Sequence, residues 1–199
     1  MLEEMNNVVE LCGVIAGKAK FSHSGRNERY YIFPLDITRL SGTVDTINVI
    51  VRQNMLEALD AGGYDRVDIT GELRSFNNKN GDGNRLVVTV FAKEIRLTNA
   101  EDKNSVTLVG TLCKTPNLRR TPLGRQICDM MIAVNRRYGR SDYLPCIAWG
   151  HHAESVAGMD VGDVIKLEGR IQSRKYIKNE NGTSIERTAF EVSVVSILL

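Results

Sequence analysis

The chain has 199 residues, of which 42% are hydrophobic and 25% charged, and 26 Lys and Arg against 24 Asp and Glu leave a formal net charge of +2. This balance is ordinary for a globular protein and excludes a polybasic tail protein or a highly charged disordered chain. The acidic start MLEEMNN lacks the apolar core of a signal peptide, and the longest apolar run, around Leu86 to Ala92, is too short to cross a bilayer. We therefore expect a cytoplasmic protein with no membrane partner.

The first half of the chain has the alternating pattern of β-strands. Apolar or small residues alternate with polar ones in Asn7–Ile15 (NVVELCGVI) and in Asp65–Ser75 (DRVDITGELRS), as in half-buried strands. Between these strands, a short helix is expected at Asn54–Leu59. The Asn80-Gly81 pair predicts a tight hairpin before the last strand of this half.

The second half repeats the first. NSVTLVGTL at Asn104–Leu112 matches the first strand, DVIKLEGRIQS at Asp163–Ser173 matches the later one, and a helix at His152–Ala157 and a turn at Asn181-Gly182 follow the same order. The repeat occurs twice and does not continue as it would in a solenoid, which indicates two tandem domains. These are residues 1–97 and 104–199, joined by a polar linker at 98–103. Five strands with a small helix after the third describe an OB-fold, so we predict an all-β protein with short helices, made of two tandem five-stranded Greek-key barrels.

Residues 104–198 contain, in this order, the segments NSVTLVGTL, PNLRRTPLGR, IAVNRR, DYLPCIAWG and GDVIKLEGRIQSRKY. Through these segments they resemble the bacterial single-stranded-DNA-binding protein (SSB) family, and residues 6–97 are similar to a more diverged copy. This resemblance implies an OB barrel that binds single-stranded DNA with little sequence preference in replication, recombination or repair, and is therefore associated with the nucleoid. Because family members bring four OB-folds together, two barrels per chain imply a homodimer. The family's acidic-tipped tail does not follow FEVSVVSILL, so recruitment of replication proteins through such a tail is not expected.

The strand patterns predict the same chemistry from the residues. In the later strand of the second half, Ile165, Leu167, Gly169 and Ile171 should face the core, and the other face carries Lys166, Glu168, Arg170, Gln172, Arg174 and Tyr176. In the strand before the helix, Leu144, Cys146 and Ala148 should face the core, leaving Tyr143, Pro145, Ile147 and Trp149 outside. Cations and aromatic rings on one face suit a phosphate backbone with stacked bases.

The candidate nucleic-acid-binding residues combine these patterns with the resemblance. The family places stacking aromatics at the positions of Tyr143, Trp149 and Tyr176, and Arg119 matches the family's Pro-x-x-Arg motif. The full set in the second half is Arg119, Arg125, Arg136, Arg137, Tyr138, Tyr143, Trp149, Arg170, Arg174, Lys175 and Tyr176. The set in the first half is Arg26, Arg29, Tyr30, Arg74 and Phe76.

The two halves differ in charge. Residues 1–97 hold 12 Lys and Arg against 13 Asp and Glu, whereas residues 104–199 hold 13 against 9. Asp68 and Glu72 of the first half stand where the second half has Lys166 and Arg170. We therefore expect the second barrel to supply most of the affinity, and the first to bind weakly or to serve the dimer interface.

Two other interpretations stay open at this point. Any solvated antiparallel strand has a polar face, and Trp149 could be a half-buried barrel or interface residue. An OB barrel could also be a primosome-type module, or bind RNA or proteins, without a general role in protecting single-stranded DNA.

Catalysis, metal binding and cofactor binding are not expected. The four cysteines are far apart in the sequence without a Cys-x-x-Cys pair, and we expect reduced, buried thiols. Cys146, His151 and His152 lack a second Cys or a carboxylate at metal-binding spacing. Glycine-rich nucleotide-binding patterns are absent from the sequence.

Overall fold

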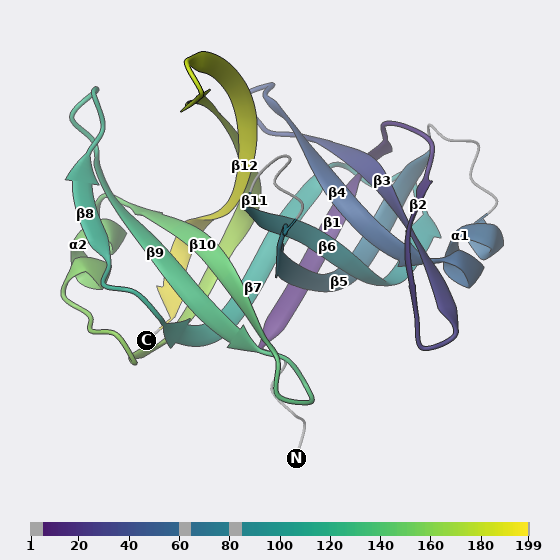
Figure 1. Ribbon diagram of the computed structural model, residues 1–199, viewed down its shortest axis with the longest axis horizontal. Coiled ribbons are helices and arrows are strands. Elements are labelled where there is room, and N and C mark those ends of the chain that lie inside the picture. Colours follow the sequence, from purple (N-terminus) through teal and green to yellow (C-terminus); the bar gives the residue numbers. More distant parts are fainter. Residues whose placement is uncertain (1–5, 60–64, 80–84, 199) are drawn as a thin grey trace. The chain divides into compact units, whose positions relative to one another are not determined.

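The computed structural model describes residues 6–59, 65–79 and 85–198, and these ranges contain twelve strands and two short helices (Figure 1). The first half of the chain holds β1 (Asn7–Ile15), β2 (Lys20–Gly25), β3 (Glu28–Thr38), β4 (Val44–Arg52), α1 (Gln53–Leu59), β5 (Arg66–Asn77) and β6 (Leu86–Leu97). The second half holds β7 (Lys103–Leu112), β8 (Asn117–Arg120), β9 (Gln126–Asn135), β10 (Ser141–Trp149), α2 (His151–Ala157), β11 (Val164–Glu180) and β12 (Thr183–Leu198). Both predicted helices are confirmed, and each begins one residue earlier than expected.

The chain forms two compact units whose borders differ from those of the sequence repeat. The N-terminal unit comprises Asn7–Arg74 and Thr89–Val106, and the C-terminal unit comprises Met1–Asn6, Ser75–Val88 and Thr107–Leu199. The end of β5 and the start of β6 thus group with the second half of the chain. Residues 98–102, in the predicted linker, have no regular secondary structure, and the division of the chain at 98–103 stays a prediction.

Five strands close into a barrel in the N-terminal unit. They follow the order β1-β3-β4-β6-β5 and return to β1, with antiparallel pairing of β1 to both β5 and β3 and parallel pairing of β4 to β6. The short β2 extends the sheet beyond β3. This closed order is that of the predicted OB barrel.

The C-terminal unit repeats the arrangement. Its ring runs β7-β9-β10-β12-β11 and returns to β7, again with one parallel pair, β10 and β12. The short β8 extends the sheet beyond β9, as β2 does in the other unit. The sequence repeat therefore corresponds to a repeat of strand order.

The inward faces of these strands form the two barrel cores. Fully buried side chains include Leu11, Phe33, Leu35 and Ile69 in the N-terminal unit, and Leu108, Ile132, Leu144 and Leu167 in the C-terminal unit. A repeated glycine allows two strands to pack closely in each barrel, because a Cβ at Gly71 would lie 2.3 Å from the Phe91 carbonyl oxygen and one at Gly169 would lie 2.4 Å from that of Ser193. The recurrence of this glycine in the sequence thus reflects a packing requirement.

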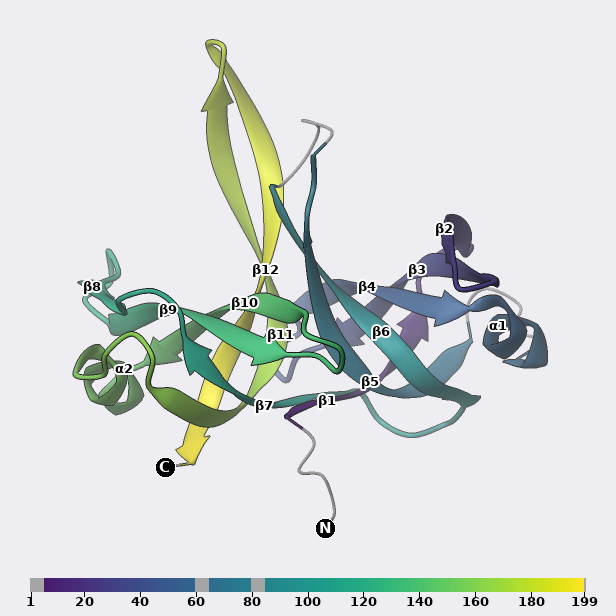
Figure 2. The ribbon, with the colours of Figure 1, turned by 60° about the horizontal axis from the view of Figure 1, so that its bottom comes forward.

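β11 and β12 continue together as a long two-stranded arm of the C-terminal unit (Figure 2). Their pairing runs from Lys166↔Leu198 to Glu180↔Thr183. Asn181 and Gly182 connect them with φ of 51° and 79°, which is the left-handed pair of a type I′ turn. This confirms the Asn-Gly hairpin, whereas its predicted counterpart at Asn80-Gly81 lies outside the described residues.

The cysteines pack as small apolar side chains. All four are free thiols; Cys12, Cys128 and Cys146 are buried and Cys113 is half-buried. Burial raises the pKa of the Cys146 thiol. Neither helix of the described ranges has the length and apolar character needed to span a bilayer.

Candidate nucleic-acid interface

The candidate surface is the outward face of β8, β9, β10, β12 and β11 in the C-terminal unit. Side chains alternate between the two faces of a strand, and paired residues on neighbouring strands share a face. The predicted core residues are buried, namely Leu144, Cys146 and Ala148 of β10 and Ile165, Leu167, Gly169 and Ile171 of β11. Ile147, which was expected outside between Tyr143 and Trp149, is only 4% exposed, so the outward face has an apolar floor at its centre.

Trp149 lies at one end of this face, directly before α2. Its ring is half-buried, and Nε1 donates a hydrogen bond to Ser193 Oγ of β12 over 3.2 Å. Trp149 lines a pocket of about 420 Å³ whose other walls are Arg120, Gly124, Arg125, Gln126 and Gly150. An indole beside two guanidinium groups suits a stacked base with its phosphates.

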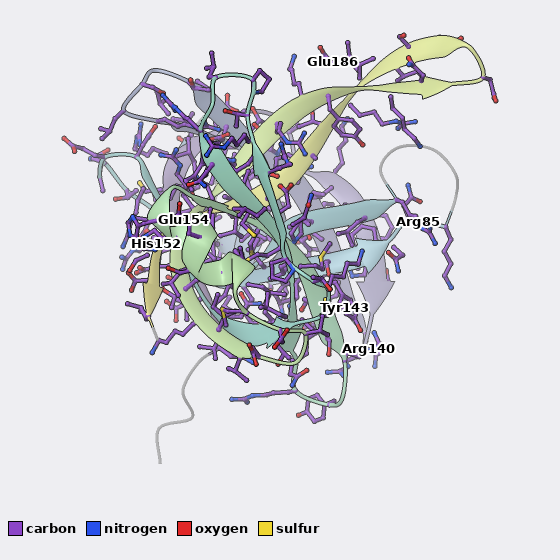
Figure 3. The ribbon with its side chains drawn as sticks, turned by 90° about the vertical axis from the view of Figure 1, so that its left-hand side faces the viewer. Arg85, Arg140, Tyr143, His152, Glu154 and Glu186 are labelled. Atoms are coloured by element: carbon purple, nitrogen blue, oxygen red, sulfur yellow. The ribbon has the colours of Figure 1, made fainter. Side chains whose placement is uncertain are left out.

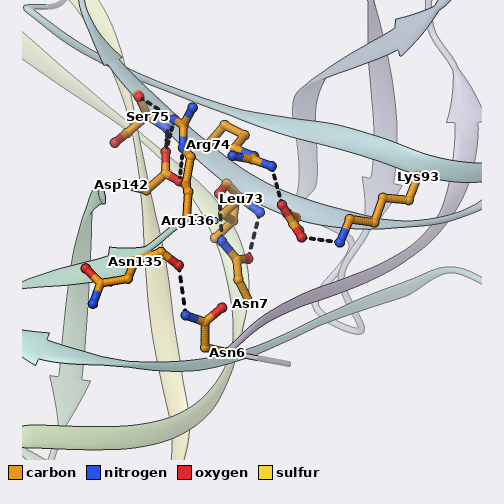
Figure 4. A network of polar contacts seen from close by, with 10 residues as sticks. Asn6, Asn7, Leu73, Arg74, Ser75, Lys93, Asn135, Arg136 and Asp142 are labelled. Atoms are coloured by element: carbon orange, nitrogen blue, oxygen red, sulfur yellow. Dashed lines mark hydrogen bonds and ion pairs between the residues drawn. The ribbon is translucent and has the colours of Figure 1, made fainter. Parts of the chain in front are cut away.

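Tyr143 lies at the other end of β10 and is 49% exposed (Figure 3). Its backbone N–H donates to Ser75 Oγ over 2.8 Å, and the Ser75 N–H donates to the carboxylate of Asp142. Asp142 is fully buried and also accepts hydrogen bonds from Nε and Nη2 of Arg136, whose Nη2 reaches the Ser75 carbonyl as well (Figure 4). This network fixes the backbone that carries Tyr143.

The network assigns Arg136 an anchoring position that sequence reasoning missed. Arg39 and Asp45 form the same pair in the N-terminal unit, with Nε and Nη2 of Arg39 each 2.6 Å from a carboxylate oxygen. In both units the aspartate is fully buried, and a charge-assisted bidentate pair compensates for its burial. An Arg followed six residues later by Asp at equivalent places of the repeat is the signal that would have identified this pair.

Two carboxylates, which the sequence also did not single out, lie among the arginines of the outward face. Asp129 on β9 pairs with Arg119, and this hydrogen bond raises the pKa of the guanidinium. Glu191 on β12 is buried, accepts a hydrogen bond from Gln172 over 2.9 Å and lies 3.7 Å from Nε of Arg174. The carboxylates hold these side chains in place on the face, and an approaching phosphate must compete with them.

Strand alternation separates the predicted residues of the arm. Arg170, Arg174 and Tyr176 share the outward face, and Arg174 Cζ lies 6.0 Å from the centroid of the Tyr176 ring. Lys175 lies on the opposite face, where it pairs with Glu186 across the hairpin over 2.9 Å. Lys175 therefore does not share the outward face with Arg170, Arg174 and Tyr176.

The remaining predicted residues of this unit lie in loops. Arg125 is exposed in the loop between β8 and β9, where it lines the Trp149 pocket. Arg137 and Tyr138 lie in the turn between β9 and β10, in which Tyr138 has a φ of 71° and is 87% exposed. This turn directly precedes the Tyr143 end of the face.

The predicted residues of the first half do not share one face. Tyr30 and Arg74 lie on the outward face of the N-terminal unit, whereas Arg29 lies on the opposite face of β3. Arg26 lies in the turn between β2 and β3 with a φ of 50°. Phe76 is 51% exposed at the end of β5, in the segment that groups with the C-terminal unit.

The aromatic rings on these surfaces can stack on bases, and the positively charged side chains can pair with phosphates. His151 and His152 begin α2 with ring centroids 3.9 Å apart. Across the described part of the chain, no three His, Cys, Asp or Glu side chains are grouped as metal ligands.

Part of the chain resembles proteins of known family. The model of the single-strand binding protein family matches residues 103–198. Single-stranded DNA-binding protein A of Bacillus subtilis (strain 168) is 34% identical over 102 residues, which cover 48% of this chain and 59% of that protein. The single-stranded DNA-binding protein of Clostridium tetani (strain Massachusetts / E88) is 40% identical over 80 residues, or 37% of this chain and 55% of that protein. The chain thus spans between about half and three fifths of the length of these relatives.

A solved structure extends the fold comparison to nearly the whole chain. The crystal structure of the wild-type single-stranded DNA binding protein from Thermus aquaticus superposes with a TM-score of 0.78 and covers 96% of this chain and 91% of that one, at 21% sequence identity. This likeness confirms the tandem OB-folds. Residues 103–198 are thus similar to the single-strand binding protein family, in a chain built of two OB-folds.

Proposed function

We propose that the chain binds single-stranded DNA with little sequence preference, in replication, recombination or repair. The observation that carries this proposal is the outward face of the C-terminal unit, where Trp149 and Tyr143 lie at the two ends of β10. Arg119 on β8 and Arg170 on β11 flank the same face, each two strands away from β10. The names of the relatives that match this chain support the same ligand.

Stacking explains why a single strand is preferred over a duplex. A base can lie on the Trp149 or Tyr143 ring only when its own face is free, which pairing and stacking in a duplex prevent. Each stacked base contributes about 1–3 kcal/mol, and every base has a π-face, so this contribution tolerates any sequence. The arginines add a salt-dependent attraction for phosphates by releasing counterions.

The direct test is equilibrium binding of labelled oligo-dT to the full chain, followed by fluorescence anisotropy at several salt concentrations. We expect the affinity for oligo-dT to fall as the salt concentration rises. Duplex DNA of equal length should compete poorly with oligo-dT for the protein. Trp149→Ala should lower the affinity by about 1–3 kcal/mol, whereas Trp149→Phe, which keeps a ring, should retain most of it. Equal binding of duplex and single strand would contradict the proposal.

We also propose that two chains associate and present four OB-folds. The support is the resemblance described above, because the family combines four OB-folds and this chain supplies two. Light scattering of the purified chain should give twice the 22.2 kDa of one copy. A mass of one copy at micromolar concentration would exclude the dimer.

A further inference from the structure

Ser75, near the end of β5, contacts β10 and the turn before it through its hydroxyl, its N–H and its carbonyl group. The hydroxyl accepts a hydrogen bond from the Tyr143 backbone N–H over 2.8 Å, and the Ser75 N–H donates to Oδ1 of Asp142 over 2.5 Å. The carbonyl oxygen accepts from Nη2 of Arg136 over 3.2 Å (Figure 4). Ser75 is 8% exposed, and these partners lie 61 to 68 residues away along the chain. A residue from the first half of the sequence repeat is thus built into the candidate interface of the second half.

The Ser75 hydroxyl contacts β10 outside the stretch that pairs with β12. β10 pairs with β9 along its whole length, whereas its parallel pairing with β12 joins Cys146 and Ile147 to that strand. Tyr143 lies before this stretch, and its N–H binds the Ser75 hydroxyl. A strand end whose backbone groups lack fixed partners opens more readily, and a serine oxygen can supply such a partner. The Ser75 hydroxyl therefore takes the place of a strand neighbour at Tyr143.

Ser75 is itself fixed through its own strand. Two residues before it, Leu73 is bound by the side chain of Asn7, whose Nδ2 donates to the Leu73 carbonyl over 2.8 Å and whose Oδ1 accepts from the Leu73 N–H over 2.9 Å (Figure 4). Asn7 and Leu73 are both buried in the N-terminal unit. The backbone before Ser75 is thus held by Asn7 and that of Ser75 by Asp142 and Arg136. The hydroxyl therefore has a defined position to which it holds the Tyr143 N–H.

The position of the Tyr143 backbone determines where its ring can stack. Tyr143 is 49% exposed, at the end of β10 opposite to Trp149. Because few rotatable bonds join the ring to the backbone, a fixed N–H restricts the ring to a small part of the outward face. A ring that is held near its stacking position before DNA arrives loses less conformational entropy on binding. The hydroxyl of Ser75 can therefore raise the affinity for a single strand through Tyr143.

We infer that Ser75 is a positioning residue for base stacking on Tyr143. It acts through the Tyr143 N–H, and the base stacks on the ring of Tyr143. This inference rests on the proposed function. It gives the first half of the sequence a part in DNA binding by the C-terminal unit, whether or not the N-terminal barrel binds DNA itself. The sequence did not indicate this part, because the partners of Ser75 lie on distant segments.

The variant Ser75→Ala isolates this role, because it removes the hydroxyl and keeps the backbone bonds to Asp142 and Arg136. It should weaken binding of oligo-dT to the full chain by about two- to tenfold, the contribution of one hydrogen bond. Fluorescence anisotropy of the labelled oligonucleotide measures this affinity. Ser75→Thr keeps a hydroxyl and should bind as the unmodified chain does. Ser41→Ala is the matched control, since it removes a hydroxyl that is bonded to Thr43 in the N-terminal unit, and it should leave the affinity unchanged.

A double-mutant cycle distinguishes positioning of Tyr143 from a general effect on the fold. Tyr143→Ala should weaken oligo-dT binding by about five- to hundredfold, the loss of one stacked base, and adding Ser75→Ala should cause no further loss. Adding Ser75→Ala to Trp149→Ala should instead multiply the two losses, because Trp149 lies at the other end of β10. Labelling the six tyrosines with ¹⁵N allows exchange of the Tyr143 backbone N–H with solvent to be followed. Without DNA, this exchange should be faster in Ser75→Ala than in the unmodified chain.

Three outcomes would overturn the inference in distinguishable ways. The same loss from Ser75→Ala with and without the Tyr143 ring would show a general defect of the fold. An unchanged affinity of Ser75→Ala, together with faster exchange of the Tyr143 N–H, would show that stacking does not depend on the fixed strand end. Both results would leave the proposed function standing. Failure of the unmodified chain to bind oligo-dT would remove the proposed function together with this inference.

Discussion

Arginines near the nucleic-acid face have different surroundings and therefore different roles. Arg136 is held by the fully buried Asp142 and by the Ser75 carbonyl, so its guanidinium is part of the folded framework. Arg120, in contrast, is exposed and lines the pocket of Trp149. Residue type alone does not distinguish these two arginines. The difference comes from the partners of Arg136, which lie 61 and 6 residues away along the chain.

Arg136→Gln should destabilise the fold more than it alters DNA contacts. The substitution leaves the Asp142 carboxylate buried without its bidentate partner, and the free energy of unfolding should fall by about 3 kcal/mol. Urea unfolding followed by Trp149 emission measures this change. Arg120→Gln is the matched control and should keep the stability while weakening oligo-dT binding. Unchanged stability of Arg136→Gln would contradict the anchoring role.

At the scale of elements, residues 98–102 illustrate how a segment without a strand can still contribute to a barrel. Asp102 pairs with Arg66 at the start of β5 and accepts a hydrogen bond from the Thr38 N–H at the end of β3 over 2.6 Å. Burial by itself raises the pKa of Asp102, but the Thr38 N–H and the Arg66 guanidinium outweigh it and hold this pKa below its ordinary value of 3.8. The ionised form is therefore favoured by folding.

Asp102 should make the stability of the N-terminal unit depend on acid pH. A lowered pKa means that the contribution is complete above the unfolded-state pKa and is lost as the pH falls through the folded-state pKa. Asp102→Asn should cost about 1–2 kcal/mol at neutral pH, and the difference from the unmodified chain should shrink as the pH falls below the ordinary aspartate pKa of 3.8. Thermal unfolding across this range tests it, and a pH-independent difference would refute the ion pair as the cause.

The arm of β11 and β12 offers a comparison between adjacent cations on opposite faces. Arg174→Ala should weaken oligo-dT binding and reduce the salt slope by about 0.7, the value for one phosphate on a single strand. Lys175→Ala removes the same charge from the face that pairs with Glu186 and should change neither quantity. Salt titrations of oligo-dT binding by both variants test this prediction. Equal losses of affinity and of salt slope in the two variants would show that the arm attracts DNA by overall charge alone.

At the scale of the whole molecule, local sequence patterns predicted the architecture. The roles of individual side chains at the candidate site depend instead on long-range contacts. The repeat, the two helices, the Asn181-Gly182 turn and the core faces of β10 and β11 follow from near-neighbour periodicity. The roles of Asp129 and Glu191 depend on strand register, which pairs residues that are distant in the sequence. The borders of the two units likewise depend on where Ser75–Val88 packs.

Trp149 fluorescence during titration with oligo-dT tests the central claim most directly. The single indole lies in the candidate pocket with Arg120 and Arg125, so a base stacked there should quench its emission to saturation, and added salt should reverse the change. Duplex DNA of equal length should cause little quenching at the same concentration. Emission that stays constant while oligo-dT binds would place the DNA elsewhere on the protein and contradict the assigned face.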